Sequence, residues 1–223
     1  MKPNKIYIRN LKKTDWSITS SAMHIFTNSR SQKTIDELWF TEHNSIFTTG
    51  LLEKNKNIIK KIRNIPIVQC NRGGKITYHG PGQQLVYMLI NLKEKKIGIK
   101  KFLFLIEKVV IKTLKKFQIT AYTIKNSPGI YINKKKFCFI GLRVKNHCSL
   151  YGISYNIHTD LSLYKYINPC GNKFIKILNL IDVIPTITMN IFRKQFIKTF
   201  LNIFKYQEKY QSSYNVFNKI YQN

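Results

Sequence analysis

Three segments of the chain repeat apolar residues at the spacing of an α-helix. In residues 99–117 the apolar side chains recur three and four positions apart, with lysines between them. The expected inward face of this helix consists of Phe102, Leu105, Ile106, Val109, Val110 and Leu114. A second helix is predicted to start at Thr188, with the apolar face Ile191, Phe192, Phe196, Phe200, Ile203 and Phe204. A third is predicted over residues 16–29, capped by Asp15, with Met23 and Phe26 at helical spacing.

Short apolar runs between these helices predict strands. The expected strands are residues 38–42, 65–69, 84–92, 130–132, 137–144 and 150–157. Turns are expected at 44–45 and 133–136, and a short helix capped by Asp160 over 160–168. The polar, lysine-rich residues 51–63 are predicted to form a surface excursion. Strands outnumber helices in the middle and helices close both ends, so we expect one α+β domain (1–223) with a mixed sheet flanked by helices.

The chain is strongly basic. It has 38 Lys and Arg against 10 Asp and Glu in 223 residues, a formal net charge of +28. Such a charge is typical of proteins that bind nucleic acid or an acidic partner. The lysines are scattered, however, and Lys, Asn, Ile, Tyr and Phe are abundant while Ala, Gly and Pro are scarce, as an A/T-rich genome would impose. We therefore ascribe most of the charge to composition, and expect steering toward acidic proteins and no nucleic-acid partner.

Cysteine spacing and apolar run lengths indicate the compartment. The four cysteines form no C-x-x-C pair, and the basic residues 1–14 contain no apolar stretch of a secretory signal. The longest strongly apolar run, residues 85–90, is too short to span a bilayer. The histidines show no metal-ligand spacing. We expect a cytosolic protein with free thiols, no metal and no membrane segment.

Glycines concentrate in one stretch. Residues 72–83 read Arg-Gly-Gly-Lys-Ile-Thr-Tyr-His-Gly-Pro-Gly-Gln and hold four of the ten glycines. Glycines gather where the backbone needs positive φ or approaches a ligand closely. The spacing matches neither of the common nucleotide-binding glycine motifs. Arg72 and His79 bracket the turn and are candidates for ligand contact; the alternative is a tight hairpin with an incidental histidine.

Cys170 lies between Pro169 and Gly171, a setting that fixes the backbone before the thiol and leaves room after it. A thiolate is a strong nucleophile, and a nearby ammonium favours it. From spacing alone, a lone cysteine is more often a small buried hydrophobe. Cys138 is expected in the core, and Cys70 and Cys148 at strand edges without an activating group.

The stretch 72–83 resembles the signature of octanoyltransferases, also called lipoate–protein ligase B. The resemblance extends over about residues 15–185, in the family's order and at compatible spacings. The other blocks are Glu42-His43 with Phe47-Thr48 and Gly50, Lys136 with Ile140-Gly141-Leu142-Arg143, Gly152 to Asn156 with Asp160-Leu161, and Ile167 to Gly171. The resemblance implies the catalytic-domain fold of the biotin and lipoate ligases.

The resemblance also implies a reaction. Cys170 would be the nucleophile and Lys136 its activating partner. The acyl-binding residues would be Arg72, Gly73, Gly74, Lys75, Ile76, Thr77, Tyr78, His79, Phe139, Ile140, Gly141, Gly152, Ile153 and Ser154. A monomeric enzyme without metal or other cofactor would move the octanoyl group from octanoyl-acyl carrier protein to Cys170. The group would then pass to a lysine of the lipoyl domains of 2-oxoacid dehydrogenases and of the glycine cleavage H protein.

Some positions depart from the family pattern. Tyr151 stands where the family commonly has histidine, and a phenol can hydrogen-bond but is no base at neutral pH. Cys138 and Phe139 replace smaller residues and would narrow the acyl site, and Lys75 adds a charge to the glycine stretch. The alternatives are an ATP-dependent lipoate or biotin ligase of the same superfamily, an inactive homologue and a non-catalytic nucleic-acid binder.

Overall fold

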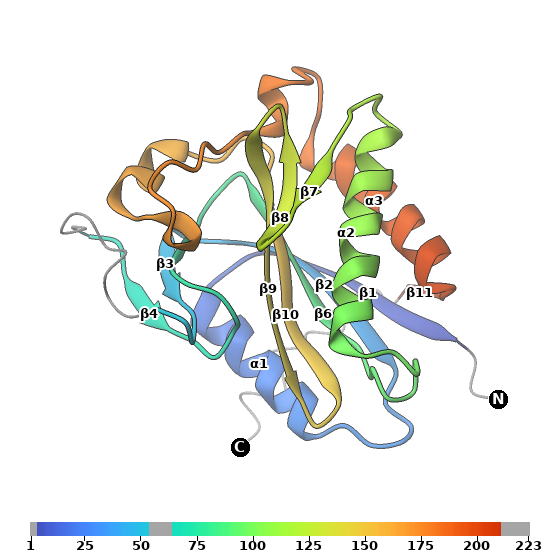
Figure 1. Ribbon diagram of the computed structural model, residues 1–223. Coiled ribbons are helices and arrows are strands. Elements are labelled where there is room, and N and C mark those ends of the chain that lie inside the picture. Colours follow the sequence, from blue (N-terminus) through green and yellow to red (C-terminus); the bar gives the residue numbers. More distant parts are fainter. Residues whose placement is uncertain (1–3, 54–63, 211–223) are drawn as a thin grey trace.

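A large mixed sheet forms the centre of the molecule, whose computed structural model describes residues 4–53 and 64–210 (Figure 1). Its strand order is β11-β1-β2-β6-β10-β9-β8-β7. One half of the sheet comprises β11 (Gln207–Tyr210), β1 (Lys5–Thr14), β2 (Asp36–His43) and β6 (Gln83–Leu89). The other half comprises β10 (Cys148–Asn156), β9 (Lys135–Lys145), β8 (Ser127–Ile132) and β7 (Tyr122–Ile124). Strand β1 pairs in parallel with β2 and β11, and the other pairs are antiparallel, which confirms the mixed sheet.

Helices cover both faces of this sheet (Figure 1). Helices α2 (Ile99–Lys115) and α3 (Met189–Phe204) pack on one face, and α1 (Trp16–Asn28) packs on the other. Side chains alternate along β2, because Leu38 and Phe40 join the α2/α3 core while Trp39 joins the α1 core. A strand buried on both faces has no polar face, and β6 accordingly buries all of its residues, including Gln83 and Gln84.

A small sheet and three 3₁₀ helices complete the described fold. The sheet has the order β4-β3-β5, with β3 (Ile46–Thr49), β4 (Ile67–Gln69) and β5 (Thr77–His79). Its residues pack with the 3₁₀ helix η1 (Leu161–Tyr166). The other two are η2 (Pro169–Gly171) and η3 (Leu180–Asp182). Strands β3 and β4 lie beside the large sheet (Figure 1), and η2 carries Cys170.

The predicted helices form, with changes to their faces and caps. Helix α2 buries the predicted face except Leu105, which is half-buried, and also buries Thr113. In α3 the buried row is Phe192, Phe196, Phe200 and Phe204, at four-residue spacing. Ile191 lies one position off this row and is 47% exposed, so its placement in the core was wrong.

The predicted caps differ in what they do. Asp15 stands at the N-cap of α1, but its side chain makes no cap hydrogen bond and accepts from Asn44 instead. Asp160 does cap, because its carboxylate accepts from the backbone N–H of Ser162 at the start of η1.

Two predictions about strands and ends were wrong. Helices do not close the chain, because β1 precedes α1 and β11 follows α3, paired at Lys5 and Gln207. The turn predicted over 133–136 is shorter: Asn133 and Lys134 have positive φ, and Lys136 already belongs to β9. The predicted strand 65–69 is only β4, and most of the predicted excursion 51–63 lies outside the described residues.

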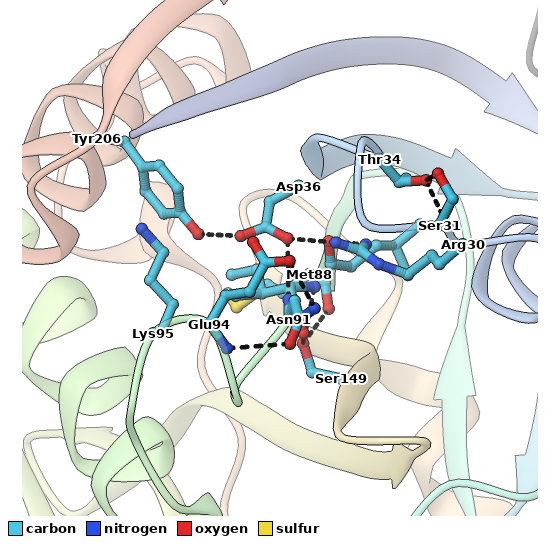
Figure 2. Close-up of polar contacts among 12 residues, drawn as sticks. Arg30, Ser31, Thr34, Asp36, Met88, Asn91, Glu94, Lys95, Ser149 and Tyr206 are labelled. Atoms are coloured by element: carbon cyan, nitrogen blue, oxygen red, sulfur yellow. Dashed lines mark hydrogen bonds and ion pairs between the residues drawn. The ribbon is translucent and has the colours of Figure 1, made fainter. Parts of the chain in front are cut away.

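A buried polar cluster, the Asp36 cluster, fixes the turn between β6 and α2 (Figure 2). Asp36 accepts from the Arg30 guanidinium, from Tyr206 Oη and from the backbone N–H of Asn91, the last at 2.9 Å. The Asn91 side chain then accepts from the Glu94 N–H at 3.1 Å. One buried carboxylate therefore positions residues 91–96, which carry Lys93 and Lys96.

Candidate active site

Cys170 is exposed and lies in a strained turn. Within η2 its φ and ψ are 58° and 15°, the left-handed region, which costs a non-glycine residue about 1–2 kcal/mol. Backbone hydrogen bonds hold the turn: Gly171 N–H donates to Asn168 O at 2.9 Å, and Asn172 N–H donates to Pro169 O at 3.1 Å. The backbone on both sides of the thiol is thus fixed.

Lys136 brings a buried ammonium to this thiol. The residue is 1% exposed, and its Nζ lies 3.2 Å from Cys170 Sγ and 2.7 Å from Pro128 O. Among the described residues no carboxylate forms an ion pair with Lys136. The buried ammonium therefore donates to one carbonyl oxygen and to the sulfur of Cys170.

Backbone pairing explains how two residues far apart in the sequence meet. The segment after Cys170 forms a parallel bridge to β9 at Ile177 and Lys136. Lys136 N–H donates to Lys176 O at 2.7 Å, and Leu178 N–H donates to Lys136 O at 3.0 Å. Gly129 makes room for the lysine stem, because a Cβ there would lie 2.5 Å from Lys136 Cε and its φ is +136°.

The glycine stretch folds against β9 and β3. Gly73 N–H donates to Leu142 O at 2.9 Å. Arg72 is buried, and its guanidinium donates to Thr48 O at 2.6 Å and to Gly73 O at 3.0 Å. Burial lowers the pKa of Arg72. Its stem crosses Gly141, where a Cβ would approach Arg72 Cδ to 3.0 Å. Arg72 thus holds the loop, besides facing the cavity described next.

An inner cavity of about 60 Å³ opens at Cys170. Twelve of the fourteen predicted acyl-binding residues line it: Arg72, Gly74, Lys75, Ile76, Thr77, His79, Phe139, Ile140, Gly141, Gly152, Ile153 and Ser154. Gly73 lines a different space, described below, and Tyr78 packs in the small-sheet core with its hydroxyl 2.9 Å from Ser45 Oγ. The sequence reasoning missed four lining residues, Trp16, Leu85, Tyr87 and Tyr151, of which only Tyr151 stood out, as a departure from the family pattern.

His79 and Tyr151 contribute uncharged groups to the inner cavity. Burial lowers the pKa of His79 to about 3, and its Nδ1 lies 2.6 Å from Gln83 Oε1. Burial raises the pKa of Tyr151, so the phenol stays neutral. Its hydroxyl lies 3.3 Å from His24 Nε2 of α1, so an imidazole stands beside the phenol.

The other cysteines lack this setting. Cys70, Cys138 and Cys148 are buried, and burial raises the pKa of Cys138 and Cys148. Among the described residues no group of three His, Cys, Asp or Glu side chains is arranged to hold a metal ion. None of the described helices is long and apolar enough to cross a membrane.

An outer groove of about 900 Å³ also opens at Cys170 and runs along β9 toward the start of α2. The inner cavity and the outer groove share four lining residues, Gly74, Lys75, Ile140 and Cys170. The thiol therefore lies where two separate spaces meet. This arrangement can bind a substrate with a chain on each side of the atom that reacts.

Comparison with known sequences points to one family. A family model described as the lipoyl protein ligase A/B catalytic domain matches residues 19–201. A relative named octanoyltransferase from Buchnera aphidicola (subsp. Acyrthosiphon pisum) is 44% identical over 198 residues, which cover 89% of this chain and 93% of the relative. Another octanoyltransferase, from Pectobacterium atrosepticum, is 39% identical over 203 residues, covering 91% and 89%.

Comparison with solved structures gives the same fold. A putative lipoate protein ligase from T. acidophilum with bound lipoic acid superposes with a TM-score of 0.80, at 14% identity, covering 97% of this chain and 92% of that one. A biotin protein ligase from Aquifex aeolicus has a TM-score of 0.53 at 10% identity, covering 92% and 71%. These likenesses confirm the predicted fold class.

Proposed function

We propose, from the premise that this chain belongs to the lipoyl protein ligase A/B catalytic domain family as one of its octanoyltransferases, that Cys170 carries the octanoyl group as a thioester between two protein partners. The enzyme is an acyltransferase of protein lipoylation, and its acceptors are lipoyl-domain proteins. The observation that carries the proposal is the 3.2 Å contact between the buried Lys136 ammonium and the exposed Cys170 thiol.

The first half of the reaction acylates Cys170. The Cys170 thiolate attacks the carbonyl carbon of octanoyl-acyl carrier protein, and the C–S bond to the carrier breaks. The leaving carrier thiolate takes a proton from the Lys136 ammonium, which regains one in the next step. The octanoyl chain enters the inner cavity, whose volume of about 60 Å³ must widen to take eight carbons, and each CH₂ buried there contributes about 0.8 kcal/mol.

The developing oxyanion needs positive charge or N–H donors beside Cys170. Gly171 N–H is already used by Asn168 O. Two ammonium groups are close instead: Lys136, and Lys75, whose Nζ would lie 2.2 Å from a Cβ built on Gly171. We assign the stabilisation of the oxyanion to these two lysines.

The second half passes the octanoyl group to the acceptor. A neutral lysine amine of a lipoyl domain attacks the thioester carbon, the C–S bond to Cys170 breaks, and an amide forms. The amine's surplus proton leaves and the Cys170 thiolate returns, with Lys136 as the nearest group to exchange protons. We place the reaction in the cytosol, because a nucleophilic thiol needs a reducing compartment. The acceptors we expect are 2-oxoacid dehydrogenases and the glycine cleavage H protein.

Intact mass spectrometry tests this function. The wild type, incubated with octanoyl-acyl carrier protein without ATP or metal, should gain one octanoyl group that hydroxylamine releases. Cys170→Ser should gain no such thioester, whereas Cys148→Ala, which removes a buried thiol, should gain it like the wild type. A hydroxylamine-labile adduct that persists in Cys170→Ser would refute the assignment of the nucleophile.

A further inference from the structure

The outer groove has an apolar floor and a basic rim. Its floor includes Leu142 and Val144 of β9 and Ile99 of α2, and Val144 and Ile99 are 40% and 44% exposed. Lys93 and Lys96 stand at the end near α2. The charged side chains that line the groove are Lys75, Lys93, Lys96 and Arg143, and none of its lining residues in the described chain is acidic.

The inner cavity and the outer groove together match the two ends of an acyl donor. An octanoyl thioester on a carrier protein has an apolar chain on one side of the reacting carbon. On the other side it has a long flexible arm, a phosphopantetheine, that ends in an anionic phosphodiester. Cys170 has the inner cavity on one side and the outer groove on the other. With the chain in the inner cavity, the arm extends into the groove toward the lysines.

We propose, resting on the function above, that the outer groove binds the phosphopantetheine arm of the donor and that Lys93 and Lys96 bind its phosphodiester. The arm's carbon segments lie on the floor formed by Ile140, Leu142 and Val144. The carrier protein then stands at the turn before α2, where the basic surface complements its acidic one. The groove therefore recognises the donor by its prosthetic arm as well as by its protein surface.

Charge and reach favour this occupant over the acceptor. The floor from Ile140 to Val144 spans four residues of strand, about 13 Å. The four-carbon stem of an acceptor lysine is far shorter, so an acceptor protein at Lys93 could not deliver its amine to Cys170. A cationic lysine would also be repelled by the basic rim, whereas a phosphodiester is attracted.

The rim is held in place before any ligand arrives. The Asp36 cluster fixes the turn through Asn91 (Figure 2), Lys96 N–H donates to Lys93 O at 3.0 Å, and Leu92 N–H donates to His147 O at 2.9 Å. Lys95, between the two rim lysines, points elsewhere, with Nζ 3.3 Å from the centre of the Tyr206 ring. Of the three lysines in this turn, Lys93 and Lys96 line the groove and Lys95 does not. The backbone of the turn is thus set, and only the exposed Lys93 and Lys96 side chains have to order when an anion binds.

The test compares two small donors that differ only in the phosphate. Acylation of Cys170 is measured with octanoyl-phosphopantetheine and with octanoyl-pantetheine. For the wild type we expect half-maximal rate at a concentration about five- to tenfold lower for the phosphorylated donor than for the other. This is the size of effect expected from two surface charge contacts. Lys93→Ser/Lys96→Ser should abolish this preference and leave the maximal rate within about twofold. The control Lys112→Ser/Lys116→Ser makes the same charge change near the other end of α2 and should keep the preference for the phosphorylated donor.

Two results would overturn the inference. One is a phosphate preference that survives in Lys93→Ser/Lys96→Ser, or that falls equally in the control. The other is a loss confined to transfer from preformed octanoyl-Cys170 to a lipoyl domain, which would make the groove an acceptor site.

A binding measurement separates this inference from the proposed function. Calorimetry of free phosphopantetheine with Cys170→Ala needs no chemistry. Binding that is weakened by adding Lys93→Ser/Lys96→Ser supports the groove site even if no acyl-enzyme ever forms. Conversely, acyl-enzyme formation without phosphate-dependent binding supports the proposed function and refutes the groove site.

Discussion

Replacing Lys136 by methionine should separate the chemical role of its ammonium from the packing role of its stem. Methionine keeps an unbranched apolar side chain in the buried path past Gly129, but removes the charge 3.2 Å from Cys170 Sγ. At that distance a unit charge pair interacts by about 5 kcal/mol at an effective dielectric of about 20, and by about 1.3 kcal/mol in bulk water. Lys136 is buried and Cys170 exposed, so an intermediate value of about 2–3 kcal/mol applies. The acylation rate should therefore fall about 30- to 160-fold.

The stability of the protein should change little. Pro128 O loses its donor, which costs about 1 kcal/mol, while removing a buried cation returns its desolvation cost. We expect the free energy of unfolding to stay within about 1 kcal/mol of the wild type, measured by urea denaturation. This stability is the control for misfolding.

The assay is single-turnover acylation by octanoyl-acyl carrier protein, followed by intact mass across a range of pH. The deficit of Lys136→Met should persist over the pH range, because the ammonium also stabilises the oxyanion and supplies the proton of the leaving carrier thiolate. Carrier affinity should be unchanged. A rate within threefold of the wild type would refute Lys136 as the activating group.

Three further outcomes are expected. Burial lowers the pKa of His43 to about 4 and of His79 to about 3, whereas both would bind protons below about 6.5 when unfolded. Stability should thus fall as the pH drops below 6.5, by about 2 kcal/mol per histidine at pH 5; a urea midpoint that stays flat from pH 7 to 5 would contradict this. Gly129→Ala should displace Lys136 and slow acylation at least tenfold, because the new Cβ would lie 2.4 Å from Cys138 O and 2.5 Å from Lys136 Cε, at a φ of +136°; a rate within twofold of the wild type would contradict this. Tyr151→Phe should lower stability by about 1 kcal/mol yet change acylation less than threefold, because the buried phenol is neutral and is no base; a tenfold slower acylation would make it a catalytic group.

Periodicity predicted the parts of the fold whose burial pattern is regular. Helix α2 was found because its apolar residues recur on one face, and the central strands because both of their faces are buried. Strand β1 was missed because few of its positions are buried and apolar and several are lysines. Its pairing with β11, at the other end of the sequence, is a contact that local pattern does not reveal.

The candidate site depended on the resemblance more than on local pattern. Cys170 and Lys136 are 34 positions apart, and their contact arises from the parallel bridge at Ile177, which no spacing rule indicates. The outer groove was not predicted, because its lining comes from β8, β9, α2, η2 and several separate loops. Gly129 carried no signal, since its role follows only from the path of the lysine stem.

The left-handed backbone conformation of Cys170 lowers the stability of the protein, whereas the thiol of the same residue is needed for the reaction. Glycine would adopt that conformation without penalty, so Cys170→Gly should raise the melting temperature while it abolishes acyl transfer. A screen that selects for stability without measuring activity would enrich this variant. A homologue no longer under selection for lipoylation would be expected to accumulate the same substitution. A cysteine kept at this unfavourable backbone conformation therefore distinguishes active members of the family from inactive homologues.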